Sequence, residues 1–154
     1  MKKIDTNKYV SVFRNLVEED KEVGLLISGN SMAPFLVHER DYIYFKKPDR
    51  QLKAGDMVFY QRENGQYIMH RIFDIKDDGY YMLGDSQFQI EGPLNESQIF
   101  ALVTKVKRKG KVLEPENLIW KFFDGPWRKS YSVRRLLFRV RRKLNSILGK
   151  GEDK

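Results

Sequence analysis

The sequence contains no cysteine and only two histidines, His38 and His70. The absence of cysteine excludes disulfide bonds, thiolate zinc sites and thiol catalysis, and it leaves the redox compartment open. Two histidines are too few for a histidine-rich metal site. The composition therefore points away from metal and thiol chemistry.

Long apolar runs are also missing. The stretch Val23-Gly-Leu-Leu-Ile27 is one of the longest, and it falls far short of the roughly 20 residues needed to cross a bilayer. The chain opens with Met-Lys-Lys, but Asp5 and Lys8 follow where a signal peptide has its apolar stretch. We therefore expect neither an export signal nor a membrane-spanning anchor. The predicted location is the cytoplasm, with peripheral attachment to a membrane left open.

Acidic residues are absent from one long segment near the C-terminus. The chain has 154 residues, with 29 Lys and Arg against 21 Asp and Glu. Nine of the basic residues, and no acid, lie within residues 128–150. They are Arg128, Lys129, Arg134, Arg135, Arg139, Arg141, Arg142, Lys143 and Lys150. The rest of the chain is nearly neutral, so the composition separates a basic appendage from the main domain.

Hydrophobic periodicity predicts a helix followed by short strands. Within residues 6–20 apolar side chains recur every three or four positions, at Tyr9, Val10, Phe13, Leu16 and Val17, as in an amphipathic helix. Runs rich in β-branched and aromatic residues, bounded by turn residues, predict strands over residues 23–28, 41–45, 57–61, 67–75, 80–83 and 100–107. Asn64-Gly65 and Asp78-Gly79 are strong hairpin signals, because both dipeptides adopt positive φ at little cost.

These elements predict a mainly β fold. Residues 1–22 supply an N-terminal amphipathic helix, and residues 23–114 form a bent antiparallel β domain. Residues 115–154 form an aromatic and basic helical appendage. A chain of this length is expected to make a single domain with its own core.

The appendage combines aromatic residues with an amphipathic, cationic helix. Its apolar stripe consists of Val133, Leu136, Leu137, Val140, Leu144, Ile147 and Leu148, with arginines on the other side. Trp120, Phe122, Phe123 and Trp127 precede it. Interfacial aromatic residues beside a cationic helix are typical of a segment that lies on an anionic membrane, here through residues 120–150. A helix packed on the domain with solvated arginines explains the pattern equally well. Nucleic acid is less favoured, since no base-reading motif accompanies the charge.

Ser31 lies at the end of an apolar run, within Ser28-Gly-Asn-Ser-Met-Ala-Pro-Phe-Leu36. A serine hydroxyl is a poor nucleophile at neutral pH, so it needs a base within hydrogen-bonding reach, and His70 and the lysines are the candidates. Strand alternation puts His70 on one face with Ile68 and Ile72. Burial there would favour the neutral imidazole that a general base requires. Taken singly, a turn serine and a half-buried structural histidine are the ordinary alternatives.

Four short blocks follow one another along the chain. They are Gly29-Asn-Ser-Met-Ala-Pro-Phe-Leu36, Gly55-Asp-Met-Val-Phe59, His70-Arg-Ile72 and Gly84-Asp-Ser86. In this order and spacing they resemble the serine peptidase superfamily of type I signal peptidases and LexA-like self-cleaving repressors. The resemblance covers roughly residues 23–106, and it implies a β domain of the LexA and signal peptidase type.

The third block departs from the bacterial members, which have a lysine as general base. This chain has His70, as the ER-type signal peptidases do, so the resemblance implies a Ser31–His70 pair. The exchange is chemically reasonable, because histidine needs far less pKa depression than lysine to be neutral at pH 7. An acid that orients the imidazole is also implied. Asp85 matches the fourth block and is favoured, and Glu91 is the alternative acid. A turn in which Asp85 closes on its own backbone amides is the structural alternative.

The resemblance implies a signal-peptidase-like serine endopeptidase that cleaves a leader or signal segment from a peptide or protein precursor without a cofactor. It also implies an extended substrate with small side chains near the cleaved bond, paired with strand edges. The backbone N–H of Ser31 is expected to bind the oxyanion, and Gly29 stands where some members have an additional hydroxyl donor. The alternative function is a non-catalytic or self-cleaving regulatory module that binds a partner or a membrane through its basic tail.

Overall fold

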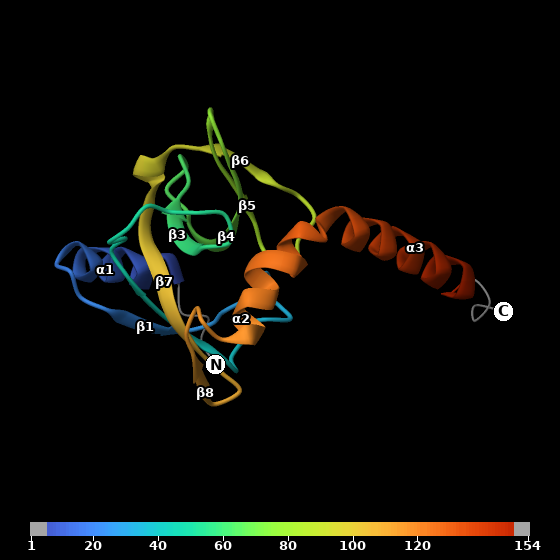
Figure 1. Cartoon of the computed structure of the whole chain (residues 1–154), viewed down its shortest axis with the longest axis horizontal. Helices are drawn as coiled ribbons and strands as arrows, with labels where there is room; N and C mark the ends of the chain where they lie inside the picture. The colour runs from blue at the N-terminus through green and yellow to red at the C-terminus, as the bar shows by residue number, and fades with distance from the viewer. Residues whose placement is uncertain (1–5, 150–154) are drawn as a thin grey trace.

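A single antiparallel sheet forms the body of the protein in the computed structural model, which describes residues 6–149. Helix α1 (Thr6–Glu18) precedes the sheet and helix α3 (Tyr131–Gly149) follows it (Figure 1). The strands are β1 (Val23–Leu26), β2 (Tyr42–Lys46), β3 (Met57–Gln61), β4 (Tyr67–Lys76), β5 (Gly79–Leu83), β6 (Glu91–Leu94), β7 (Ile99–Arg108) and β8 (Lys111–Leu113). A short 3₁₀ helix, η1 (Glu96–Gln98), precedes β7, and α2 (Leu118–Phe122) and the π-helical turn η2 (Phe123–Trp127) precede α3. The predicted mainly β fold is confirmed.

The two longest strands each pair with more than one neighbour. The strands lie in the order β1-β2-β7-β3-β4-β5-β6, and β8 pairs with β7. Residues 67–71 of β4 pair with β3, whereas residues 71–76 pair with β5. Register shifts interrupt the pairings of β7 with β2 and with β3, and such irregularities bend a sheet. Within the described residues, no strand pairs with the outer edge of residues 67–70 or of β1, so two strand edges remain open.

Helix α1 packs on the sheet through the apolar face that the sequence predicts. Val10 and Val17 are buried, and Phe13 contacts Phe45 edge-on with 6.4 Å between ring centroids. The side chain of Tyr9 lies outside the described residues. The helix packs against β1 and β7 and ends at Glu18, two residues before the predicted end.

Strands β6 and β8 are not predicted by the sequence. Strand β6 contains Gly92 and Pro93, two residues that are depleted in strands, and it lies at the edge of the sheet beside β5. Strand β8 has only three residues and folds back on β7 through the turn at Lys109 and Gly110. Both strands are held by pairing with a longer neighbour rather than by their own apolar pattern.

The aromatic residues of the appendage belong mostly to the core, so the expectation of an interfacial aromatic cluster is wrong for two of them. Trp120 and Phe123 are buried and pack on Phe35, with ring centroids 5.8 and 5.0 Å away. Trp127 is half-buried, and only Phe122 is exposed. The segment that carries these rings therefore closes the hydrophobic core beside the Ser31 block.

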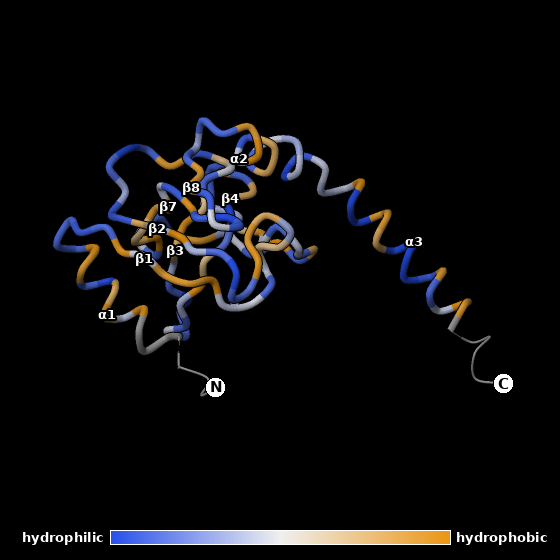
Figure 2. The backbone as a smooth tube through the Cα atoms, turned by 90° about the horizontal axis from the view of Figure 1, so that it is seen from below, coloured by the Kyte–Doolittle hydropathy of each residue, from blue (hydrophilic) through white to orange (hydrophobic). Residues whose placement is uncertain are grey.

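The predicted basic helix is present as α3, which extends away from the body (Figure 1). Along it, hydrophobic and hydrophilic residues alternate with helical spacing (Figure 2). Among residues 6–149, no helix is both long enough and apolar enough to cross a membrane. The first five residues and residues 150–154, including Lys150, lie outside the described part of the chain, and the three-part division of the chain stays a prediction.

Removing the buried tryptophan should loosen the core where α2 closes it. We expect Trp120→Ala to lower the free energy of unfolding by about 3–5 kcal/mol, because a large buried ring leaves a cavity. The exposed neighbour Phe122 is the matched control, and Phe122→Ala should cost about 1 kcal/mol or less. Chemical denaturation of both variants measures the difference. Equal, small losses would contradict the packing of Trp120 in the core.

Candidate active site

A tight turn presents Ser31 at the end of β1. Gly29 has φ +91°, a left-handed conformation that glycine adopts without strain. After it, Met32, Phe35 and Leu36 are all buried, and the N–H of Leu36 donates to the carbonyl of Met32 over 2.9 Å. The apolar side chains at these helical intervals fix the turn to the core. Ser31 stays half-buried at its edge.

The fourth sequence block holds the backbone of this turn. The N–H of Ser86 donates to the carbonyl of Ser31 over 3.0 Å, and the Ser86 hydroxyl donates to the carbonyl of Asn30 over 2.7 Å. A Cβ at Gly84 would lie only 2.5 Å from the carbonyl oxygen of Ser31, so glycine is needed for this approach. Within residues 6–149, nothing accepts a hydrogen bond from the backbone N–H of Ser31, which leaves that donor available.

His70 lies in β4 opposite Val58 of β3, and it is 6% exposed. Ile72, on the same face of the strand, is buried as the alternation predicts. Burial lowers the pKa of His70 from 6.5 to about 4, the nearby carboxylate of Glu91 opposes this shift, and Arg62 adds to it. The imidazole is therefore neutral at pH 7, the protonation state that a general base needs.

Three side chains form a polar chain behind His70. The Tyr60 hydroxyl lies 3.3 Å from Nδ1 of His70 and donates to Oε1 of Glu91 over 3.0 Å. Arg62 binds the same carboxylate, with 2.7 Å from Nη2 to Oε1 and 3.0 Å from Nε to Oε2. Burial alone would raise the pKa of Glu91, but the hydrogen bonds from Arg62 and Tyr60 outweigh it and keep the pKa below its ordinary value. Glu91 is therefore ionised at neutral pH.

The protonation states of Tyr60 and Glu91 fix the tautomer of His70. An ionised Glu91 only accepts, so the single proton of the Tyr60 hydroxyl goes to Glu91. The Tyr60 oxygen can then accept a hydrogen bond from Nδ1–H of His70. In that arrangement Nε2 of the neutral ring carries the free lone pair.

Asp85, the favoured acid, has a different partner. Its two carboxylate oxygens bind Nε and Nη2 of Arg71 over 2.8 and 2.9 Å, and both side chains are buried. Nη1 of Arg71 donates to the carbonyl of Gly55 over 2.8 Å, and the guanidinium lies over the ring of Phe35, 5.6 Å from its centroid. The structure therefore places Asp85 in an ion pair with Arg71, and it places Glu91 in the polar chain that reaches His70.

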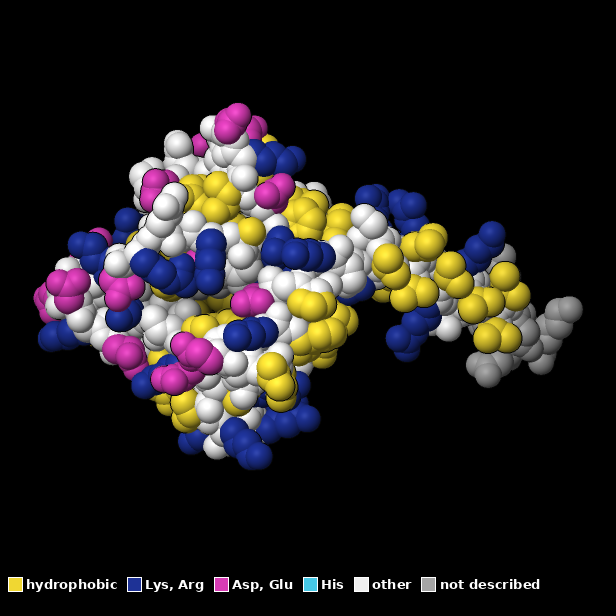
Figure 3. Space-filling model, in the orientation of Figure 1, with side chains coloured by type: hydrophobic (Ala, Val, Ile, Leu, Met, Phe, Trp, Pro, Cys, Tyr) yellow, Lys and Arg dark blue, Asp and Glu magenta, His cyan; other side chains and the backbone are white. Residues whose placement is uncertain are grey.

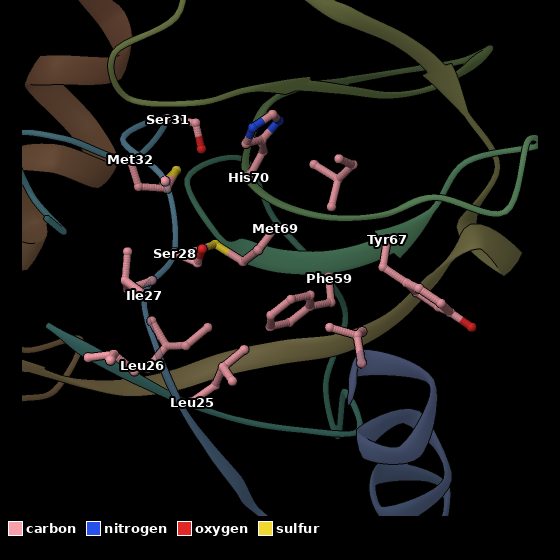
Figure 4. A pocket seen from close by; sticks show the side chains of 14 residues that line it. Leu25, Leu26, Ile27, Ser28, Ser31, Met32, Phe59, Tyr67, Met69 and His70 are labelled. Atoms are coloured by element: carbon pink, nitrogen blue, oxygen red, sulfur yellow. The ribbon is translucent and has the colours of Figure 1, made fainter. Parts of the chain in front are cut away.

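Ser31 and His70 line the same pocket, which has a volume of about 160 Å³. Figure 4 shows the two side chains next to each other at one end of this pocket. Its walls are mainly apolar and come from α1, the end of β1 and the turn after it, β2, β3 and the first half of β4. Ser28 is a second serine in its lining. No hydrogen bond joins Ser31 and His70 among the described residues. Such contacts in proteins without bound substrate are often long and tighten on binding.

The other histidine has a supporting position. Nδ1 of His38 accepts a hydrogen bond from the backbone N–H of Gly29 over 2.7 Å, so His38 stabilises the turn before Ser31. The side chain is exposed. In the described part of the chain, no group of three or more His, Asp or Glu side chains is arranged to hold a metal ion.

Sequence reasoning missed the roles of Tyr60, Arg62 and Arg71. The Asn64-Gly65 hairpin signal could have revealed Tyr60. With the turn centred there, Val58 faces His70 and Tyr60 faces Ile68 in the ladder of β3 and β4. Tyr60 is then the diagonal neighbour of His70 on the same face. No local sequence signal links Arg62 to Glu91, because 29 residues separate them.

The low pKa of His70 should make stability depend on pH. Between pH 6.5 and about 4 the unfolded chain binds a proton at this residue that the folded protein does not. The free energy of unfolding therefore falls as the pH drops through that range, by on the order of 3 kcal/mol. We expect His70→Gln to lose less stability than the unchanged protein between about pH 7 and about pH 4.5. Urea denaturation at both pH values tests this, and a parallel decline in the two proteins would contradict the low pKa.

Comparison with known proteins identifies the family of the chain. Residues 2–106, about two thirds of the chain, match the family described as Peptidase S24-like. A search among curated proteins returned no match. The matched range includes all four sequence blocks, the turn of Ser31 and the strand of His70. The chain therefore belongs to the Peptidase S24-like family of the LexA and signal peptidase superfamily.

Proposed function

We propose that the protein is a serine endopeptidase that uses Ser31 as nucleophile and His70 as general base. The observation that carries the proposal is the presence of both side chains in one pocket, with the imidazole buried in its neutral form. We further propose that its substrate is a leader or signal segment of a peptide or protein precursor, as in the signal peptidases that the motif blocks resemble.

The proposed reaction proceeds through an acyl-enzyme. Oγ of Ser31 attacks the scissile carbonyl carbon while Nε2 of His70 takes the hydroxyl proton, and the backbone N–H of Ser31 binds the oxyanion. The imidazolium then gives this proton to the leaving amine as the peptide bond breaks. Water, deprotonated by His70, attacks the ester and releases the acid and the free Ser31 hydroxyl.

In this mechanism Tyr60 and Glu91, linked by a hydrogen bond, replace an acid that would bind the imidazole of His70 directly. The Tyr60 oxygen accepts from Nδ1–H and orients the ring, and the charge of Glu91 stabilises the imidazolium that forms. Both are positioning residues, because neither touches the substrate. Glu91, the alternative acid of the sequence, is thus preferred over Asp85, whose carboxylate is bound by Arg71.

The open strand edges support an extended substrate. Leu25 and Leu26 of β1 and the first half of β4 line opposite sides of the pocket, and neither outer edge pairs with another described strand. A peptide inserted there can form main-chain hydrogen bonds by strand addition. The apolar pocket of about 160 Å³ then suits small apolar side chains next to the cleaved bond.

Acylation by a serine-reactive probe tests the nucleophile without a known substrate. We expect a fluorophosphonate to modify Ser31 in the unchanged protein, and Ser31→Ala and His70→Ala each to abolish the modification. Ser28→Ala is the matched control, since Ser28 lines the same pocket and should leave the labelling intact. Mass spectrometry of the intact chain and its peptides gives the readout. A protein that resists labelling, or that is labelled equally well in His70→Ala, would favour the non-catalytic module instead.

The pH profile of Ser31 acylation separates the two candidate acids. Tyr60→Phe should slow acylation about fivefold, because a neutral hydrogen bond contributes roughly 1 kcal/mol. Glu91→Gln should also slow acylation. It should move the acid limb of the profile, where the acylation rate falls as His70 is protonated, to lower pH, since the Glu91 charge raises the pKa of His70. Asp85→Asn should leave the position of the acid limb unchanged but lower the melting temperature, because it breaks a buried ion pair. An acid limb that moves in Asp85→Asn and stays in Glu91→Gln would reverse the assignment.

A further inference from the structure

Within residues 6–149, helix α3 contacts the body only near its start. The Tyr131 hydroxyl donates to the carbonyl of Phe88, and the ring of Phe138 stacks on Phe88 with centroids 4.6 Å apart. Nη1 of Arg134 donates to the carbonyl of Asp85 over 2.9 Å. Helix α3 extends away from the body (Figure 1), and residues 139–148 are all exposed.

The unpacked helix carries a continuous apolar stripe. Its side chains are between 48% and 69% exposed, although all of them are Val, Leu or Ile. They are Val133, Leu136, Leu137, Val140, Leu144, Ile147 and Leu148. Figure 3 shows the stripe along one face of α3, with Lys and Arg side chains on both of its borders. Exposed apolar surface of this extent, rimmed by charge, marks an interaction site.

Helix α2 adds apolar side chains on the same side of the molecule. Leu118, Ile119 and Phe122 are 82%, 42% and 48% exposed. In Figure 3 hydrophobic side chains over α2 face the same way as the α3 stripe. A second group of exposed apolar side chains therefore lies on the body, on the same side as the α3 stripe.

The charge of α3 selects the kind of partner. No acid lies within residues 128–150, and nine basic residues do. A second copy of the chain would bring like charges together along the stripe, which is unfavourable. Nucleic acid would neutralise the charges but offers no apolar surface for the leucines. A lipid surface with anionic headgroups binds both the apolar stripe and the basic side chains of α3. The apolar side chains enter the acyl region while arginines contact phosphates.

We propose that α3, together with the exposed face of α2, docks the protein on an anionic lipid surface. The proposal goes beyond the peptidase activity and does not depend on it. The contacts at the base of α3 would also orient the bound protein. Trp127 and Arg134 both donate to the carbonyl of Asp85, and its neighbour Ser86 holds the backbone of Ser31. The membrane-bound helix and the pocket would thus be held in a fixed relation.

Binding to lipid vesicles tests this surface. The full-length Ser31→Ala protein should float with vesicles of equimolar phosphatidylglycerol and phosphatidylcholine, bind much less to vesicles of phosphatidylcholine alone, and dissociate at high ionic strength. Leu137→Ser combined with Leu144→Ser should lower the partition coefficient at least about tenfold. Arg139→Gln combined with Arg142→Gln should lower it about thirtyfold, since each charge contributes about 1 kcal/mol.

Val112→Ser, at an exposed apolar position on β8, is the matched control and should bind like the parent. Circular dichroism checks that the helix persists in each variant. The proposal is overturned if the protein ignores anionic vesicles, or if the double leucine variant binds them equally well. It is also overturned if sedimentation shows a dimer that the leucine variant abolishes, or if α3 binds duplex DNA and not vesicles.

Discussion

A buried ion pair between Arg71 and Asp85 holds the candidate active site together. The guanidinium also binds the carbonyl of Gly55 and lies over Phe35, so all four sequence blocks meet at one side chain. Burying two charges is costly unless every donor and acceptor has a partner, and here both carboxylate oxygens are bound by the guanidinium. Without this pair, the loop that supports the backbone of Ser31 would lose its side-chain attachment to β4.

The two carboxylates near the site have separate tasks because their surroundings differ. Asp85 is 3% exposed and forms an ion pair with the buried Arg71, so its charge is compensated there and the pair holds the loop. Glu91 is half-buried and shared between Arg62 and Tyr60, so part of its field still reaches His70. In the proposed mechanism this division lets one acid hold the loop while the other supports the base. Burial of the imidazole keeps it neutral, which is the protonation state that the proposed general base needs.

The C-terminal segment likewise divides into two parts. Trp120 and Phe123 close the core against Phe35, whereas the apolar stripe of α3 has no partner in the described protein. In the sequence, the aromatic segment and the helix look like one amphipathic appendage. Only the packing shows that the first part is buried and the second is exposed. Trp127 links the two parts, since its indole donates to the carbonyl of Asp85 and its ring lies beneath Arg134. The first part of this segment thus packs into the core, and the second part presents exposed apolar surface.

The sequence by itself determined the mainly β class, the longer strands and both terminal helices, and its resemblance to a peptidase superfamily predicted the pairing of Ser31 with His70. The alternation of apolar and polar residues and the turn dipeptides are local properties, and the order of the motifs is read along the chain. All three can therefore be recognised without coordinates. The choice between Asp85 and Glu91 is different. It depends on which distant arginine each acid meets, and that follows from the register and bending of a sheet whose contacts span many residues. Strands β6 and β8 and the burial of Trp120 were decided in the same way, because long-range pairing and packing override weak local preferences.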